Sequence, residues 1–298
     1  MTLVATLISD PRAAGLTPPV ANMAARAVGA SGIRWLAPQI ACDVMLVDGL
    51  SREEAEKALR QTLAGLPLDI VVQPAEGRRK KMLIADMDST MIEQECIDEL
   101  ADEIGIKEHV AAITARAMNG EIAFEPALRE RVALLKGLDL EVIEHVIKSR
   151  ITLAPGAREL VATMNAAGAY TALVSGGFDL FTGRVAAMLG FREHRANRLI
   201  ENEGKLVGEV AEPILGRKAK ADALTEIAAR LKLDASEVMA VGDGANDLDM
   251  LHLAGAGVAI HAKPAVAAEA RIRIDHGDLT ALLYLQGYRR EEFRAVGQ

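Results

Sequence analysis

The stretch Met82-Leu83-Ile84-Ala85-Asp86-Met87-Asp88-Ser89-Thr90 places two carboxylates directly after a short apolar run. An apolar run of this length, bounded by polar residues, predicts a buried strand that ends before Asp86. Because the chain leaves its pleat where a strand ends, Asp86 and Asp88 can both project into one active-site mouth. The pair therefore offers a nucleophile and an acid/base group side by side.

Further short apolar runs follow and alternate with helical segments. We expect strands at residues 82–85, 169–174, 238–241, 257–260 and 271–274. We expect helices at residues 157–167, 180–189, 218–231 and 247–253. Apolar runs flanked by Gly, Pro or Asp suit strands that are buried on both faces of a parallel sheet. The order of elements predicts an α/β fold with a doubly wound, mostly parallel sheet.

The first crossover of this sheet is too long for a simple connection. Residues 93–150 are rich in Ala, Glu and Leu, and we interpret them as an inserted helical cap. A connection of this size inside a compact domain usually covers a site. The predicted catalytic core therefore comprises residues 82–92 and 151–298, with a β-hairpin at 197–210 as a side excursion.

The N-terminal part of the chain has a different order of elements. Its apolar runs and helical segments alternate as βαββαβ, and Ser51 with Glu54 forms the signature of a capping box at a helix start. This order is the plan of ferredoxin-like α+β domains. We predict an ACT-like domain of this kind at residues 1–75 and a linker at 76–81. The plan permits ligand binding or dimerisation, so the sequence is compatible with a homodimer.

Composition narrows the range of partners. The chain has 298 residues, 50% of them hydrophobic, and a formal net charge of −8. This acidic balance argues against binding to nucleic acid or to an anionic membrane surface. The first residues lack the features of a signal peptide, and no apolar run reaches membrane-spanning length. Cys42 and Cys96 form no disulfide or zinc pattern. We expect a cytoplasmic protein that acts on a small molecule.

Two other predicted strand ends carry polar motifs. These are Ser175-Gly176-Gly177 and Gly242-Asp243-Gly244-Ala245-Asn246-Asp247. Ligands of an open α/β sheet bind beyond the carboxyl ends of its strands. Carboxylates that converge there repel one another unless a hard cation binds among them, and oxygen ligands favour Mg²⁺. Each motif alone is also typical of a turn or a helix cap. Their joint placement at three strand ends indicates phosphoryl transfer.

Together with Lys220, these motifs resemble the four motifs of the haloacid dehalogenase (HAD) superfamily. The resemblance covers about residues 81–286, including the cap segments 95–100 and 124–132. It implies a HAD-like Rossmannoid core with an inserted cap. Residues 1–75 are similar, more loosely, to the N-terminal extension of some bacterial members.

The resemblance implies a mechanism in two steps. Asp86 would attack phosphorus to give an aspartyl-phosphate, and Asp88 would serve first as acid and then as base. Mg²⁺ would be held by the Asp86 side chain, the Asp88 backbone carbonyl and the Asp243 side chain. Asp247 would orient metal-bound water.

The resemblance also assigns a phosphate cradle to Ser175, the Gly176 amide, Lys220 and Asn246. Lys218 competes with Lys220 for the role of phosphate-binding lysine. Residues two apart on a helix point in different directions, so both cannot easily face the site. The family motif aligns with Lys220, and we expect Lys218 to be solvated.

The resemblance assigns the choice of substrate to residues of the cap. Phosphoserine carries an ammonium and a carboxylate beyond its phosphate, and Glu95 and Arg131 fit these two charges by resemblance. Met118 and Phe124 would line the apolar wall, and Gly177 would also contact the substrate. The expected reaction is hydrolysis of O-phospho-L-serine to L-serine and phosphate, the last step of L-serine biosynthesis. Two alternatives stay open, namely action on another small phosphomonoester, by hydrolysis or by transfer, and a non-catalytic amino-acid sensor.

Overall fold

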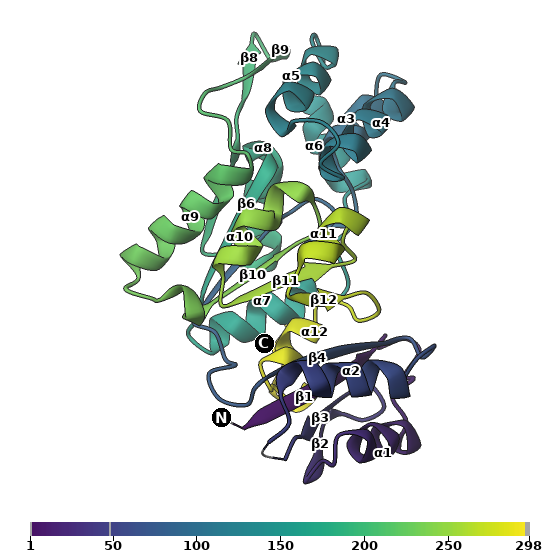
Figure 1. Cartoon of the computed structure of the whole chain (residues 1–298). Helices are drawn as coiled ribbons and strands as arrows, with labels where there is room; N and C mark the ends of the chain where they lie inside the picture. Colours follow the sequence, from purple (N-terminus) through teal and green to yellow (C-terminus); the bar gives the residue numbers. More distant parts are fainter. Residues whose placement is uncertain (1, 48, 296–298) are drawn as a thin grey trace. The chain divides into compact units, whose positions relative to one another are not determined.

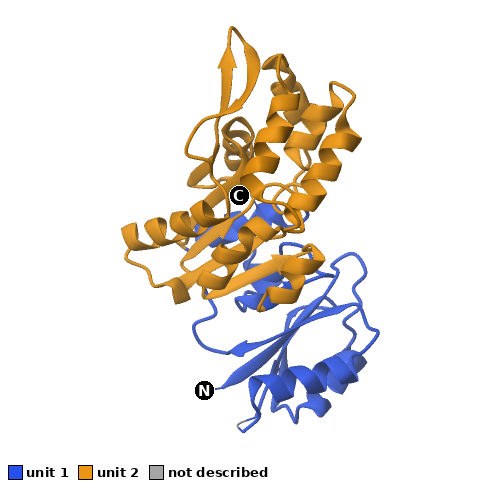
Figure 2. Ribbon diagram, turned by 45° about the horizontal axis from the view of Figure 1, so that its top comes forward, with its two compact units in different colours: residues 1–80, 155–167, 272–298 blue, residues 81–154, 168–271 orange. Residues whose placement is uncertain are grey.

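The computed structural model describes residues 2–47 and 49–295. The chain divides into two compact units, and each contains more than one stretch of sequence (Figure 2). The first unit comprises residues 1–80, 155–167 and 272–298. The second comprises residues 81–154 and 168–271.

The first unit contains a four-stranded antiparallel sheet with the order β2-β3-β1-β4. Its strands and helices are β1 (Leu3–Ser9), α1 (Pro18–Ala27), β2 (Gly32–Ala37), β3 (Ala41–Met45), α2 (Arg52–Thr62) and β4 (Leu68–Pro74). The capping box at α2 is present, because Ser51 accepts from the Glu54 N–H and the Glu54 side chain accepts from the Ser51 N–H. The βαββαβ order and the strand order are those of a ferredoxin-like domain, as predicted.

The other two stretches of the first unit contribute α7 (Ala157–Ala166), β12 (Ile272–Ile274) and α12 (Ala281–Leu285). Asp69 on β4 holds the chain that follows β12. Its buried carboxylate accepts hydrogen bonds from the backbone N–H groups of Asp275 and Gly277, both at 2.7 Å. Burial raises the pKa of Asp69, and these N–H groups offset part of that rise. The domain boundary at residue 75 stays a prediction, and the observed unit extends beyond it.

The second unit is built on a parallel sheet. Five of the six strands of this sheet belong to the unit, in the order β11-β10-β5-β6-β7, and every neighbouring pair among these five is parallel. The strands are β5 (Met82–Ala85), β6 (Tyr170–Phe178), β7 (Glu193–Asn197), β10 (Val238–Gly242) and β11 (Ala256–Ile260). The helices that accompany them are α8 (Asp179–Leu189), α9 (Arg217–Arg230), α10 (Leu248–Leu253) and α11 (Pro264–Glu269) (Figure 1). The predicted α/β class with a mostly parallel sheet is confirmed.

Strand β7 is absent from the sequence prediction. Its residues Glu193-His194-Arg195-Ala196-Asn197 are mostly polar, and it pairs on one side only, with β6. An edge strand of a sheet is not buried on both faces, so it need not carry the apolar run on which the prediction depended.

The cap consists of four helices, which are α3 (Cys96–Asp102), α4 (Lys107–Met118), α5 (Phe124–Leu134) and α6 (Glu141–Ser149). The predicted hairpin is formed by β8 (Leu199–Asn202) and β9 (Lys205–Val210), and it lies beside α5 (Figure 1). Leu206 connects the two by exchanging backbone hydrogen bonds with Gly137 and Leu138 at 2.8 and 2.9 Å. In the part of the chain that the structure describes, no helix is both long enough and apolar enough to cross a bilayer.

Candidate active site

Neighbouring strands of the parallel sheet bring the predicted motifs together. Strands β5 and β10 pair with Ala85 opposite Val241, so Asp86 and Asp243 emerge at the same edge of the sheet. Ser175, Gly176 and Gly177 were expected after their strand, but they lie within β6. The pairing of β6 with β7 is irregular between Val174 and Phe178. The chain therefore leaves the regular ladder at the Ser-Gly-Gly segment, although the strand continues past it.

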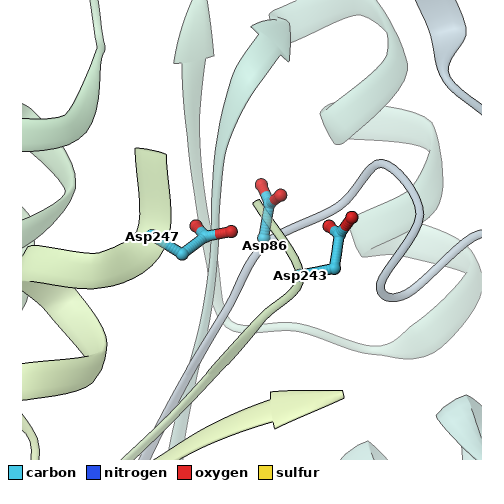
Figure 3. Close-up of side chains that lie close together, drawn as sticks. All are labelled: Asp86, Asp243 and Asp247. Atoms are coloured by element: carbon cyan, nitrogen blue, oxygen red, sulfur yellow. The ribbon is translucent and has the colours of Figure 1, made fainter. Parts of the chain in front are cut away.

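Three buried carboxylates form the centre of the site. Oxygens of Asp86, Asp243 and Asp247 lie within 4.8 Å of one another, with Asp247 reaching toward the other two from the turn before α10 (Figure 3). Burial raises the pKa of Asp86 well above its usual value, and the charge of Asp247 raises it further. The same two causes raise the pKa of Asp243 to about 6. This degree of crowding requires a cation to keep all three groups ionised.

Lys220 supplies one such charge from the first turn of α9. Its ammonium lies 2.6 Å from Asp86 Oδ1 and donates to Asp247 Oδ1, also at 2.6 Å. The side chain is fully buried. Burial alone lowers the pKa of Lys220, but Asp247 and Asp86 outweigh it, so the pKa lies above its usual value. Lys218 points away, with 85% of its side chain exposed and its ammonium paired with Asp222.

The donor set also fits a divalent cation. Among the described residues, Asn246 Oδ1 is buried and accepts no hydrogen bond, and the nearest cation to Asp243 Oδ2 is Lys263 Nζ at 3.5 Å. Asp86 Oδ1 contacts the Lys220 ammonium and has no further donor. Buried acceptors are normally satisfied, and unpaired oxygens at a carboxylate cluster are what a hard cation binds. The other oxygen of Asp243 accepts from Thr90 Oγ1 at 3.2 Å, which orients this side chain.

Asp88 has a different environment from Asp86. One of its carboxylate oxygens accepts from the Cys96 N–H at 3.0 Å, and the other lies 3.5 Å from Ser175 Oγ. Burial raises the pKa of Asp88, and the hydrogen bond from Cys96 opposes this rise. A carboxyl group whose pKa is raised gives up and takes back a proton more readily near neutral pH. The two aspartates of the opening motif are therefore suited to different tasks.

The two glycines of the Ser-Gly-Gly segment leave room for their neighbours. A Cβ on Gly176 would lie 2.7 Å from the ring of Phe124, and one on Gly177 would lie 2.6 Å from Asp88 Oδ2. The Gly177 N–H donates to Ser175 Oγ at 2.8 Å. The hydroxyl proton of Ser175 therefore points away from this N–H, toward another acceptor. Side chains at these positions would displace groups that border the site.

One cavity of about 30 Å³ lies between core and cap. It is lined by Asp86, Asp88, Glu95, Ile97, Met118, Phe124, Leu128, Arg131, Ser175, Gly176, Gly177, Phe178 and Asn246. This volume has room for water, and residues of both the core and the cap border it. Ten of the predicted site residues line the cavity, and the other three, Lys220, Asp243 and Asp247, belong to the carboxylate centre.

The cap contributes one acidic and one basic side chain to this cavity. Glu95 precedes α3 and accepts from Ser89 Oγ at 2.7 Å. Burial raises its pKa well above the usual value, and the charges of Asp88 and Asp243 add to the rise. Arg131 on α5 is only 2% exposed. Burial lowers its pKa, and the nearby carboxylates of Glu95 and Asp98 oppose this effect.

Sequence reasoning missed Asn197, the last residue of β7. Its side-chain amide donates to the Gly176 carbonyl at 2.8 Å and its side-chain oxygen accepts from the Leu215 N–H at 2.6 Å. These bonds fix the backbone of the Ser-Gly-Gly segment. No local signal marks this role, because Asn197 lies far from Gly176 in sequence. The sequence predicts Asn197 as the first residue of the hairpin at 197–210, whereas it ends β7 and the hairpin begins at Leu199. Ser89 and Thr90 belong to the opening motif, but nothing in that motif assigns them a role.

Comparison with known proteins places this site in a family. Residues 83–252, more than half of the chain, match the family described as haloacid dehalogenase-like hydrolase. The chain belongs to this family. The predicted resemblance to the HAD superfamily is therefore confirmed.

Relatives of this HAD-family chain include proteins named phosphoserine phosphatase. One from Archaeoglobus fulgidus is 46% identical over 222 residues, which are 73% of this chain and 64% of the relative. One from Methanocaldococcus jannaschii is 42% identical over 206 residues, which are 69% of this chain and 97% of the relative. The match thus spans less than two thirds of the first relative and nearly all of the second.

Two solved structures resemble different extents of this HAD-family chain. A phospho-aspartyl intermediate analogue of phosphoserine phosphatase has a TM-score of 0.66 and 42% identity, covering 69% of this chain and 98% of the other. A HAD family hydrolase from Salmonella enterica serovar Typhi has a TM-score of 0.83 and 30% identity, covering 95% of this chain and 98% of the other. The second likeness includes most of the first unit.

Proposed function

We propose that this chain is a Mg²⁺-dependent phosphatase that hydrolyses O-phospho-L-serine to L-serine and phosphate, the last step of L-serine biosynthesis. The observation that carries the proposal is the single cavity in which Asp86 and Asp88 face Glu95 and Arg131. The carboxylates serve the phosphate end of such a substrate. The cap pair offers an acidic partner for its ammonium and a basic partner for its carboxylate. The relatives named phosphoserine phosphatase support the same substrate.

The reaction begins with the attack of an Asp86 oxygen on phosphorus. The bond from phosphorus to the seryl oxygen breaks, and Asp88 gives its proton to that oxygen, so L-serine leaves and Asp86 carries the phosphoryl group. Asp88 then takes a proton from water as the water attacks phosphorus. The bond to Asp86 breaks and phosphate leaves. The different contacts of the two groups support this division of work, because Asp86 Oδ1 lies 2.6 Å from the Lys220 ammonium, whereas Asp88 accepts from the Cys96 N–H and lies 3.5 Å from Ser175 Oγ.

The surrounding residues bind and orient the phosphoryl group. Lys220, Ser175, the Gly176 amide and Asn246 would donate to its oxygens, as the cradle proposed from the sequence requires. Asp86, the Asp88 backbone carbonyl and Asp243 would hold Mg²⁺, and Asp247 would orient its water. When bound, the ion neutralises phosphate charge and suppresses the repulsion between Asp86 and the substrate.

The test is phosphate release from O-phospho-L-serine in the presence of Mg²⁺, with Asp86→Asn as the variant. We expect turnover to be abolished, because the amide is a poor nucleophile. Asp249→Asn is the matched control, since Asp249 is half-exposed and pairs with Arg217 outside the site. Near-normal turnover in Asp86→Asn contradicts the mechanism.

A panel of phosphomonoesters, measured on the unmodified chain, tests the substrate. A clear preference for O-phospho-L-serine supports the proposal. A preference for a sugar phosphate contradicts it, as does transfer of the phosphoryl group to an alcohol instead of water. Absence of turnover on every ester, together with binding of L-serine, would favour the sensor hypothesis.

A further inference from the structure

Inside the cap, a hydrogen-bonded chain joins one residue from each of three helices. Arg131 on α5 donates through Nη1 to Thr114 Oγ1 on α4 at 2.9 Å. Thr114 Oγ1 in turn donates to Asp98 Oδ1 on α3 at 2.7 Å. The exposed fractions of Asp98, Thr114 and Arg131 are 9%, 3% and 2%. The three groups therefore meet in a place from which water is almost excluded.

The direction of these bonds follows from the single hydroxyl proton of Thr114. The Val110 carbonyl is a second acceptor at 3.1 Å, but the Asp98 carboxylate is nearer and charged. Hydrogen bonds to an ionised acceptor are about twice as strong as neutral ones, so the proton goes to Asp98. A lone pair of Thr114 Oγ1 then faces Arg131. Asp98 thus fixes which way the hydroxyl points.

The arrangement leaves part of the Arg131 guanidinium available. Nε donates to the Ala127 carbonyl at 3.0 Å, and Nη1 donates to Thr114. Among residues 2–47 and 49–295, no group accepts a hydrogen bond from Nη2, and Arg131 lines the cavity. A direct ion pair with Asp98 would occupy the paired N–H groups of the Arg131 guanidinium, which a carboxylate ligand needs. The intervening hydroxyl keeps the charge of Asp98 close without that contact.

We infer that Thr114, oriented by Asp98, is a positioning residue that presents the Arg131 guanidinium to the carboxylate of the substrate. The inference rests on the proposed function, because it requires a substrate with a carboxylate. It adds that selection of an amino-acid phosphate depends on two residues that do not line the cavity. Their effect must therefore appear only with substrates that carry the carboxylate.

The experiment compares two substrates with three variants. O-phospho-L-serine and O-phosphoethanolamine share the phosphate and the ammonium, and only the first has a carboxylate. Thr114→Val removes the hydroxyl and keeps the shape, whereas Thr114→Ser keeps the hydroxyl. Loss of a hydrogen bond to a charged group is expected to raise KM for phosphoserine about tenfold or more in Thr114→Val, with kcat nearly unchanged. We expect kcat/KM for phosphoethanolamine to stay within about twofold, and Thr114→Ser to behave like the unmodified chain.

Asp98→Asn tests the second link and covers the case in which Thr114→Val does not fold. An asparagine oxygen still accepts from Thr114 but carries no charge, so the preference for phosphoserine should fall by a smaller factor. Thr225→Val is the control, because Thr225 is exposed on α9 and, among the residues that the structure describes, its hydroxyl bonds only to the Ala221 carbonyl. This variant should not change the preference.

The outcomes separate the inference from the proposed function. If the unmodified chain does not prefer phosphoserine to phosphoethanolamine, the proposed substrate is wrong and the role of Thr114 is lost with it. If the unmodified chain shows the preference and Thr114→Val keeps it, only the inference is wrong. Equal losses on both substrates in Thr114→Val would likewise assign Thr114 a purely structural role. An unchanged preference in Asp98→Asn would refute the role of Asp98.

Discussion

Replacement of Lys220 by methionine should destabilise the second unit strongly. The ammonium lies 2.6 Å from both Asp86 Oδ1 and Asp247 Oδ1, and the side chain is fully buried. Methionine keeps most of the volume and removes the charge. Removal of one partner of a buried ion pair typically costs about 3–5 kcal/mol, because the remaining charge is left without compensation.

The geometry supports a value in this range. The oxygens of Asp86, Asp243 and Asp247 lie within 4.8 Å of one another. Two unit charges at that separation repel by about 3.5 kcal/mol or more at an effective dielectric constant of ~20. Without Lys220, folding must either accept this repulsion or protonate one of the carboxyl groups. We therefore expect Lys220→Met to lose about 3–5 kcal/mol of unfolding free energy in a metal-free buffer.

Urea unfolding followed by circular dichroism measures this loss. The single tryptophan, Trp35, lies on β2, so its fluorescence follows the first unit separately. Lys218→Met is the matched control on the same helix, and as an exposed substitution it should stay within about 0.5 kcal/mol of the unmodified chain. The double variant Lys220→Met with Asp247→Asn should recover at least ~1 kcal/mol, because one of the crowded charges is gone. A loss below ~1 kcal/mol in Lys220→Met, or no recovery in the double variant, refutes the electrostatic reasoning.

Three further predictions concern other parts of the molecule. Arg78→Met should cost about 1.5–3 kcal/mol, seen as an earlier Trp35 fluorescence transition in urea, because Arg78 forms two hydrogen bonds, at 3.1 and 2.8 Å, with the fully buried Asp43, which keeps Arg34 as its other cationic partner. An unshifted transition would mean that this pair contributes nothing. Gly177→Ala should lower kcat about tenfold to a hundredfold in the phosphate-release assay, because its Cβ would lie 2.6 Å from Asp88 Oδ2. Unchanged kcat would show that Asp88 can shift without consequence. Chelation of Mg²⁺ should abolish phosphate release, and Mg²⁺ at about 100 times its Kd should add about 2.7 kcal/mol to the unfolding free energy. Full activity in excess chelator would rule out the proposed metal requirement.

The sequence sufficed for the elements whose signals are local. The apolar runs at β5, β10 and β11 mark strands that are buried throughout, and the capping box at Ser51 marks the start of α2. The polar motifs after β5 and β10 could be brought together in advance, because parallel strands of one sheet share a carboxyl edge.

The sequence did not suffice where pairing partners decide the outcome. The length of β6 depends on where its ladder with β7 becomes irregular, and β7 itself has the polar composition of an edge strand. Asn197 supports Gly176 from 21 residues away, and Thr114 supports Arg131 from 17 residues away. Such contacts are set by tertiary packing, and neither periodicity nor a short motif records them.

The hydrogen bonds between Asp69 and the segment after β12 affect the order in which the chain can fold during synthesis. Asp69 and Asp275, whose backbone N–H donates to the Asp69 carboxylate, are 206 residues apart. At the usual rates of ribosomal elongation, roughly 10–40 s pass between the appearance of the two. The first sheet is made early, but its unit is completed only when nearly the whole chain has been translated. Residues 81–154 and 168–271 are all synthesised within that interval, so the second unit can form before the first is finished.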